Sequence, residues 1–466
     1  MKFLELLRPS GTISRGAYAI TGLVGIALKH NIDRLVASLA FHKPWGLFNY
    51  WIPVRDVPRI TQLGGSDAKF LATMVALSLP FIWIGVVLTM KRLRTAGLPV
   101  QLVLLFFLPV LNLLFFLILC LIPERRSLED SISSRSGYSL LSHIVPPSKF
   151  GSAAISLLIV VPVGFATAVF STQVLGNYGW GLFVALPFTV GFVSALLYEI
   201  HEPRSLRACV GVACTAVGLL GLALMAVALE GAFCLIMALP LALPLAAFGG
   251  GCAHVIQKRR RPQQGATALF SLVLLFTPGI EWTEHLTAIP APVFVVRSAI
   301  EIQAPPEKVW KEVVAFTEIP PPSEWIFRAG IAYPIRAEIF GTGPGAERHC
   351  VFSTGAFVEP IQIWDEPHLL KFSVTSNPAP MEEWTPYKHI EPPHLHGFLV
   401  SEGGQFLLTP LPNGGTRLEG TTWYHHGLWP STYWKIWSDA IIHRIHMRVL
   451  RHIRDEAEGS LSAASR

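Results

Sequence analysis

Residues 294–310, which read FVVRSAIEIQAPPEKVW, mark a sharp change of pattern in this chain of 466 residues. As far as Gln303, apolar and polar side chains alternate, which is the period of a half-buried strand. Two prolines then open a helix, because a proline in the first helical turn gives up no hydrogen bond. One face of this helix is apolar and carries Val309, Val313 and Phe316. The stretch therefore predicts a strand followed directly by an amphipathic helix.

Further strand-like runs follow, separated by turn signals such as the glycine-rich segment 341–345. We expect six of these strands, at 332–340, 346–354, 356–364, 368–376, 396–410 and 415–425. A long helix with one apolar face then extends from Ser431 to Glu458. The predicted order is one strand, two short helices, six antiparallel strands and a long final helix.

This order resembles the helix-grip fold of the START/Bet v 1-like (SRPBCC) superfamily, and most of all its polyketide cyclase/dehydrase branch. Arg297–Trp310 is similar to the superfamily's opening pattern, hydrophobic-x-I-x-A-P-P-E-x-V-W, and Trp364–Pro367 and Gly415–Gly420 match it further along. The resemblance covers 290–460 and implies an α+β domain whose curved antiparallel sheet wraps around a long C-terminal helix. It also implies an apolar cavity between sheet and helix, a usual ligand site. It names no function, because this fold hosts carriers, receptors and enzymes.

The sequence before this domain is of a different kind. Over the whole chain 51% of residues are hydrophobic and 15% are charged, whereas a soluble globular chain carries roughly 25% charged residues. The apolar residues gather in runs of about twenty, the length that crosses a bilayer. We therefore predict an α-helical polytopic membrane region, made of a membrane domain over 1–125, a four-span block over 150–255 and a last short apolar segment over 265–280.

Charge divides the chain in the same way. Residues 1–280 contain 22 Lys and Arg against 10 Asp and Glu, and residues 281–466 contain 15 against 21. Basic residues in short loops favour the cytoplasmic side of a membrane, so we expect a cytoplasmic N-terminus and no nucleic-acid partner. The basic clusters lie at 91–94, 125–126, 204–207 and 258–261. All four clusters can be cytoplasmic only if the segment 98–122 is a re-entrant hairpin that returns to the same face. Pro109 and Asn112 interrupt this segment and favour such a hairpin. The alternative is a kinked span that leaves one cluster on the wrong side.

With that hairpin, the segment 265–280 carries the C-terminal domain to the extracytoplasmic side. The segment is short, so an interfacial path that leaves the domain in the cytoplasm stays open. Residues 11–18 and 91–97 also resemble, in degraded form, a bacterial inner-membrane family of unknown function with a G-R-x-S-R opening and an R-L-H-D loop. That resemblance implies a multi-pass protein of the bacterial inner membrane and no activity.

An irregular insertion between two predicted strands, 376–393, contains five prolines and is a candidate gate over the cavity. A rigid surface loop is an equal alternative. The candidate ligand-binding residues come from this insertion, from a strand and from the final helix: Met381, Trp384, Tyr387, Phe372, Trp434, Trp437, Ser438, Ile441 and Ile445.

Acid–base chemistry would need a carboxylate or a histidine at the cavity, and the candidate catalytic residues are Glu359, His394 and His396. If His394 and His396 lie on a strand, they share a face. The sequence contains no HExxH spacing and no CxxC pair, so we predict surface histidines, no metal and no cofactor.

The sequence leaves three functions open. The first is membrane-anchored binding, transfer or sensing of a hydrophobic ligand, lipid-like or polyketide-like, with membrane lipids and a small molecule as partners. The second is an enzyme of the cyclase/dehydrase or hydrolase type that uses His and Glu residues of the cavity. The third is a structural or partner-binding membrane protein. Transport is not favoured, because the ionisable residues of the four-span block lie near predicted span ends, where a solvated interface is expected: Glu199, Glu230 and His254.

Overall fold

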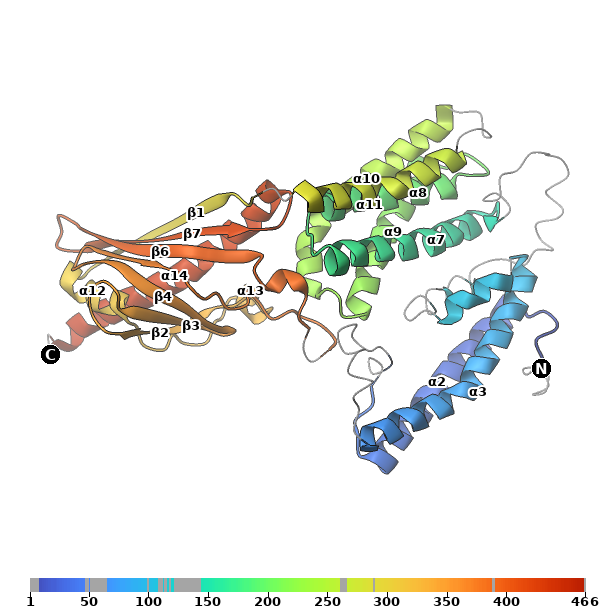
Figure 1. Ribbon diagram of the computed structural model, residues 1–466, viewed down its shortest axis with the longest axis horizontal. Coiled ribbons are helices and arrows are strands. Elements are labelled where there is room, and N and C mark those ends of the chain that lie inside the picture. The colour runs from blue at the N-terminus through green and yellow to red at the C-terminus, as the bar shows by residue number, and fades with distance from the viewer. Residues whose placement is uncertain are drawn as a thin grey trace.

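The structure, a computed structural model, has a bundle of apolar helices at one end and a β-sheet domain at the other (Figure 1). It describes residues 8–46, 50, 65–98, 100–107, 112, 115–116, 119–120, 144–259, 266–287, 290–387 and 390–464. The basic cluster 125–126 and the centre of the predicted hairpin, with Pro109, lie outside these residues.

Five of the described helices are long and apolar enough to cross a membrane: Asp67–Ala96, Lys149–Val174, Gly181–Tyr198, Leu206–Ala226 and Ala232–Lys258. Each of them spans at least 18 residues, and about 20 apolar residues are needed to cross the hydrocarbon core. The chain is thus built as a multi-pass membrane protein.

The four-span block packs around its shortest helix, α8 (Leu186–Tyr198), whose side chains are nearly all buried. Its neighbours are α7 (Lys149–Val169), α9 (Leu206–Ala226) and α10 (Ala232–Arg259). Turns of π-helix, Phe170–Val174 and Gly181–Ala185, lengthen α7 and α8 at the end nearest the β-sheet domain.

Glycines bring α8 and α10 into backbone contact. A Cβ atom added to Gly191 would lie 2.2 Å from the carbonyl oxygen of Ala246, and one added to Gly249 would lie 2.3 Å from that of Phe188. Small residues at such positions let membrane helices approach closely. The two glycines therefore fix the centre of the block.

The first helices, α2 (Arg15–Phe41) and α3 (Gly65–Ala96), pair with each other. Arg92 of α3 is fully buried and donates a hydrogen bond from Nε to the carbonyl oxygen of Leu119 (2.9 Å). Leu98 and Leu119 are buried in the same apolar cluster. The described residues near the two ends of the predicted hairpin therefore lie together.

The last helix of the membrane region, α11 (Ala266–Thr287), is longer than the predicted segment 265–280. Its 22 residues extend over about 33 Å, enough to cross the ~30 Å hydrocarbon core. The added turns contain Glu284, which accepts hydrogen bonds from the backbone N–H groups of Trp180 and Gly181 (2.7 and 3.0 Å). These turns were not predicted, because they lie beyond the apolar run and contain polar side chains. The polar side chain of Glu284 is bonded there to the π-helical turn of the neighbouring helix.

The C-terminal domain is a curled antiparallel sheet of seven strands in the order β1-β7-β6-β5-β4-β3-β2. Its strands are β1 (Val293–Ile302), β2 (Pro334–Phe340), β3 (Glu347–Phe352), β4 (Gly355–Asp365), β5 (Leu369–Ser373), β6 (Leu399–Pro410) and β7 (Thr416–His426). Two short helices, α12 (Pro306–Val314) and α13 (Trp325–Arg328), follow β1. The long helix α14 (Ser431–Ala464) packs against β1, β7 and β2 and runs behind the sheet in Figure 1. The predicted helix-grip fold is confirmed.

The opening stretch supplies much of the core of this domain. Ile302, Val309 and Val313 are completely buried, and Leu450 and Ile453 of α14 are buried against them. Each fully buried aliphatic side chain of this size contributes about 1.5–3 kcal/mol. The strand, the helix and α14 therefore close one end of the domain, and the cavity lies nearer the other end.

Candidate functional site

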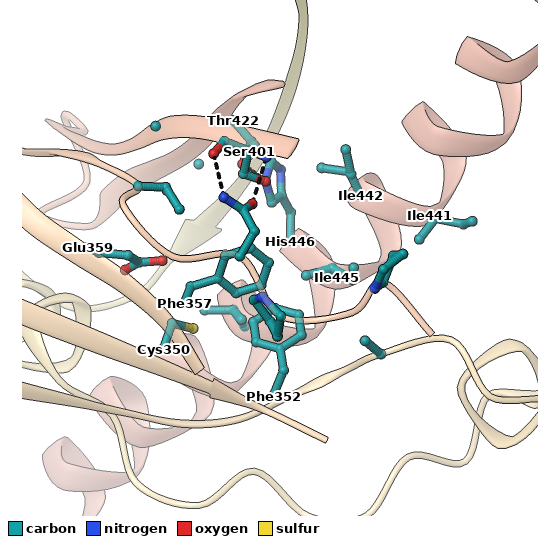
Figure 2. Close-up of a pocket in the computed structure, with 18 of the residues that line it drawn as sticks. Cys350, Phe352, Phe357, Glu359, Ser401, Thr422, Ile441, Ile442, Ile445 and His446 are labelled. Carbon is teal, nitrogen blue, oxygen red and sulfur yellow. Dashed lines mark hydrogen bonds between the residues drawn. The ribbon is translucent and has the colours of Figure 1, made fainter. Parts of the chain in front are cut away.

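A cavity of about 160 Å³ lies between the sheet and α14, and we call it the grip cavity. Figure 2 shows Phe352 and Phe357 of the sheet on one side and Ile441 and Ile445 of α14 on the other. Alternate residues of a strand point to one face, which is why Arg348, Cys350 and Phe352 of β3 all line this cavity.

The charged part of the grip cavity is a buried ion pair. The guanidinium of Arg348 donates to the carboxylate of Glu359, and these residues are 1% and 6% exposed. The rings of Phe316, Phe372 and Phe406 surround this guanidinium at 5.5–5.7 Å. Burial raises the pKa of Glu359, and Arg348 opposes that rise in part. Nη2 of Arg348 has no hydrogen-bond partner among the described residues and is free to meet a polar ligand group.

A second polar group lies near the mouth of the grip cavity. The side chain of Asn377 accepts from the backbone N–H of Ser401 (2.8 Å) and donates to its carbonyl oxygen (3.2 Å). Thr422 shares a hydrogen bond with Nε2 of His446 (2.7 Å). Burial, with a smaller effect of the neighbouring His443, lowers the pKa of His446 to about 4. His446 is therefore neutral at physiological pH.

Cys350 lines the grip cavity as a buried thiol. Burial, and after it the charge of Glu359, raises the pKa of its thiol to about 12. The thiolate is the reactive form of a cysteine, and it is absent at neutral pH.

A larger cavity of about 510 Å³ lies where the helix bundle meets the C-terminal domain, and we call it the junction cavity. Its wall combines residues of α8, α9 and α10 with residues of α14 and of the insertion 376–393. Leu222 and Ile236 line it although 56% and 52% of their surface is exposed. The junction cavity therefore reaches the outer surface of the bundle between α9 and α10.

The two cavities adjoin. Four residues line both of them: Pro380, Met381, Leu399 and Ile441. A short apolar wall is thus all that lies between the grip cavity and a cavity that reaches the surface of the membrane helices.

Hydrogen bonds join the two halves of the molecule around this wall. The backbone N–H of Ala232 donates to the carbonyl oxygen of Trp384 (2.8 Å), and that of Trp429 donates to Tyr178 (3.0 Å). The hydroxyl of Tyr387 donates to the carbonyl oxygen of Ala226 in α9. The hydroxyl of Tyr433 likewise donates to Met237 in α10. Tyr387 and the backbone of Trp384 thus hold the insertion against the bundle.

The predicted ligand-binding residues divide into four groups. Phe372 and Ile445 line the grip cavity, and Met381 and Ile441 line both cavities. The junction cavity alone is lined by Trp434, Trp437 and Ser438. Trp384 and Tyr387 line neither; Trp384 is 70% exposed and Tyr387 is bonded to α9.

The candidate catalytic residues lie apart. Glu359 belongs to the grip cavity, His394 belongs to the junction cavity, and His396 is exposed and lines neither. His394 and His396 do not share a face, because Pro393–Leu395 is a turn of 3-10 helix and β6 begins only at Leu399. The pair of prolines before His394 starts this turn in place of a strand.

Two acidic residues that we expected at a solvated interface are buried. Glu199 is 3% exposed and accepts hydrogen bonds from the backbone of Arg204 and from Nδ1 of His254, both at 2.8 Å. Glu230 is 9% exposed and accepts from the hydroxyl of Tyr178 (2.9 Å). Both lie near span ends, as predicted, but neighbouring helices cover them.

Sequence reasoning missed Arg348 as a site residue. The signal was present, because Arg348 occupies an inward position in the alternation of β3, where a lone arginine needs a buried partner. Glu359 stands directly opposite it on β4.

Comparison with known proteins finds the C-terminal domain alone. No protein-family model matches the chain, and no curated protein matches it. Among solved structures, truncated norcoclaurine synthase from Thalictrum flavum is 14% identical, with a TM-score of 0.24. The match covers 36% of this chain and 94% of that one. The Zhui aromatase/cyclase from Streptomyces sp. R1128 is also 14% identical, covers 37% of this chain and 98% of its own, and has a TM-score of 0.25.

At these TM-scores the likenesses carry no functional argument. The helix-grip fold of the C-terminal domain is shown by its own strand order and by the position of α14. The resemblance of the N-terminal quarter to a bacterial inner-membrane family finds no support in the comparisons.

Proposed function

We propose that the protein is a membrane-anchored binder of a hydrophobic ligand, which it transfers or senses between the bilayer and the grip cavity. The observation that carries this proposal is the shared wall of the two cavities, built by Pro380, Met381, Leu399 and Ile441. A ligand that leaves the lipid between α9 and α10 enters the junction cavity first and has only this wall to pass. Most of the surface along this route is apolar, so an acyl or polycyclic chain meets little unpaired polar surface.

The ligand also carries a polar acceptor group. Nη2 of Arg348 and Oγ1 of Thr421 are buried at the grip cavity without hydrogen-bond partners among the described residues. Leaving a buried donor unpaired costs about 1–3 kcal/mol, so a ligand carbonyl, hydroxyl or carboxyl oxygen would gain by pairing with them. Lipid-like and polyketide-like molecules both offer such oxygens.

The test is whether a side chain that fills the grip cavity displaces a co-purified ligand. Ile445→Trp fills the cavity from α14, and Ile436→Trp adds the same group on an exposed face of the same helix. The full chain is purified in detergent, and its bound small molecules are extracted and counted by mass spectrometry. We expect at least a fivefold loss of one lipid-like species in Ile445→Trp and no change in Ile436→Trp.

Equal amounts of that species in wild type and in both variants would overturn the proposal. So would a wild-type protein that carries no such species and binds no fluorescent fatty acid. The grip cavity does not favour the enzymatic alternative, since its one carboxylate candidate, Glu359, is engaged by Arg348.

A further inference from the structure

Four side chains able to bind a metal meet at the wall of the junction cavity. Cys234 lies in the first turn of α10 and Glu230 lies in the turn just before that helix, whereas Glu383 lies in the insertion 376–393 and His394 directly follows it. Cys234 and His394 are 160 positions apart in the chain. No motif search can find such a set, because each half contributes only two of its members.

The imidazole of His394 is the centre of this cluster. Its Nε2 atom lies 2.9 Å from Sγ of Cys234 and 3.6 Å from Oε1 of Glu383. Its Nδ1 atom lies 3.4 Å from Oε2 of Glu230, whose other oxygen accepts from the hydroxyl of Tyr178. The ring therefore has a thiol and a carboxylate on one side and a second carboxylate on the other.

Glu383 is buried without a hydrogen bond, and His394 at 3.6 Å is its nearest basic group among the described residues. Its side chain is completely inaccessible, and neither carboxylate oxygen has a hydrogen-bond donor among the described residues. The same carboxylate lies against the backbone of Gly231, where an added Cβ would be 2.1 Å from Oε2. A buried carboxylate with no donor costs several kcal/mol, and such a group is normally paired or bound to a metal.

The charged groups around His394 also favour a bound cation. His394 is the only basic side chain within 4 Å of either carboxylate in the part of the chain that the structure describes. A divalent cation would supply positive charge beside both carboxylates and would also stabilise a thiolate at Cys234.

We propose that this cluster binds a divalent transition-metal cation of the zinc class, with Nε2 of His394, Sγ of Cys234 and a carboxylate oxygen of Glu383 as ligands. Tetrahedral ligands about 2.1 Å from an ion are ~3.4 Å apart, close to the 3.6 Å between Nε2 and Oε1. The 2.9 Å between Nε2 and Sγ is shorter, so the side chain of Cys234 would have to move away from the ring by about half an ångström on binding. Sulfur and imidazole ligands select zinc-like ions over magnesium and calcium. The thiol of Cys234 releases its proton to solvent on binding.

Glu230 takes a different part in the same site. Its Oε2 atom lies 3.4 Å from Nδ1 of His394, which has no hydrogen-bond partner among the described residues, and its other oxygen accepts from Tyr178. With a metal bound, a small rotation of the ring would let Nδ1–H donate to Glu230 and so fix the ring. Carboxylates in this position fix the tautomer and the direction of a ligating histidine. Three protein ligands leave a fourth position for water. Because two ligands belong to each half, the ion would also fasten the C-terminal domain to the bundle.

The site is tested on the full chain in detergent, loaded with Zn²⁺ and freed of excess ion. We expect about one zinc per chain in wild type by plasma mass spectrometry, and a loss of at least tenfold in Glu383→Gln and in Cys234→Ser. Cys214→Ser is the matched control, because Cys214 is another cysteine of the bundle that bonds only to a backbone carbonyl. Glu230→Gln removes an orienting residue and weakens binding about 10–100-fold without abolishing it.

A second readout needs no variant. Wild type loaded with Co²⁺ shows a thiolate-to-cobalt charge-transfer band, and a chelator removes it. Substoichiometric zinc in wild type, or no such band, overturns the proposal and leaves a Cys–His–Glu hydrogen-bond network. Unchanged zinc in both ligand variants overturns it as well. None of these results depends on the hydrophobic ligand, so the ligand proposal stands or falls separately.

Discussion

Arg348 and Glu359 are the residues on which the grip cavity depends. Arg348 and Glu359 are bonded to each other and are only 1% and 6% exposed to solvent. Arg348→Met therefore leaves the carboxylate of Glu359 buried and without its partner. Breaking a buried pair in this way costs about 3–5 kcal/mol. We expect a clearly lower unfolding midpoint, measured by intrinsic fluorescence of the full chain in detergent.

Two further variants separate this loss from a general effect of removing arginine. Arg417→Met removes an exposed arginine of β7 whose nearest carboxylate is 3.8 Å away, and we expect almost no change. Arg348→Met combined with Glu359→Leu removes both charges and recovers most of the midpoint. A double variant as unstable as the single one would show that the pair is not the cause.

His446 makes the same domain sensitive to acid. Burial holds the pKa of its imidazole at about 4, below the ordinary 6.5. The unfolded chain therefore binds a proton that the folded chain excludes, and stability falls as pH drops from 6.5 towards 4. The unfolding midpoint of wild type should decrease over this window, and that of His446→Gln should decrease less. An identical slope in the two proteins would assign the acid sensitivity to other groups.

At the scale of elements, α8 and α10 depend on the absence of a side chain. Gly191→Ala pushes a methyl group to 2.2 Å from the backbone oxygen of Ala246, a contact that only helix displacement relieves. Overpacking of this kind costs about 1–3 kcal/mol. Gly211→Ala in α9 meets nothing within 4 Å and should be neutral or slightly stabilising. The two variants are compared by thermal aggregation in detergent, and equal midpoints would contradict the proposed helix contact.

Elements with a strong local pattern were predictable from the sequence. The strand β1, the helix α12, the six later strands and α14 all follow from alternation, prolines and one apolar face. Phe316 was placed on the face of the first helix, but that helix ends at Val314 and Phe316 instead pairs with Ala337 in a β-bridge. Elements decided by distant contacts were not predictable. The 3-10 turn Pro393–Leu395 removes the shared strand face considered for His394 and His396. The added turns of α11 depend on Glu284 meeting a π-helical turn about a hundred residues earlier.

The candidate site likewise has one part that was predictable from the sequence and one part that was not. Met381, Phe372, Ile441 and Ile445 were predictable, since a helix-grip cavity lies between the sheet and the final helix. The junction cavity was not, because its walls come from α8, α9 and α10 as well as from α14. The sequence alone does not show how the helix bundle and the C-terminal domain pack against each other.

At the scale of the whole molecule, the basic residues gather away from the C-terminal domain. Helix α9 begins beside Arg204 and ends at Ala226, which bonds to Tyr387 of that domain. Helix α10 begins at Ala232, bonded to Trp384, and reaches Lys258 one helix length later. Basic loops favour the cytoplasmic side, so we infer an extracytoplasmic C-terminal domain.

The hairpin proposed for 98–122 agrees with this orientation. Lys91–Arg94 lie near the end of α3, and Leu93 is buried with Ile155 close to the start of α7. Leu119, near the other end of the predicted hairpin, lies beside the same basic cluster, because its carbonyl oxygen accepts a hydrogen bond from Arg92. A path that leaves and re-enters at one face keeps this cluster on the side of Arg204 and Lys258.

The orientation is tested with reporter fusions. Alkaline phosphatase at the C-terminal end of the chain should be active, and a fluorescent protein at the same position should be dark, because each folds on one side of the membrane only. Fusions directly after Lys258 are the matched control and should show the reverse, since α11 would no longer carry the reporter across. Fluorescence at both positions, with inactive phosphatase, would place the C-terminal domain in the cytoplasm. The junction cavity would then open towards the inner leaflet, and the proposed ligand would have to be supplied from that side.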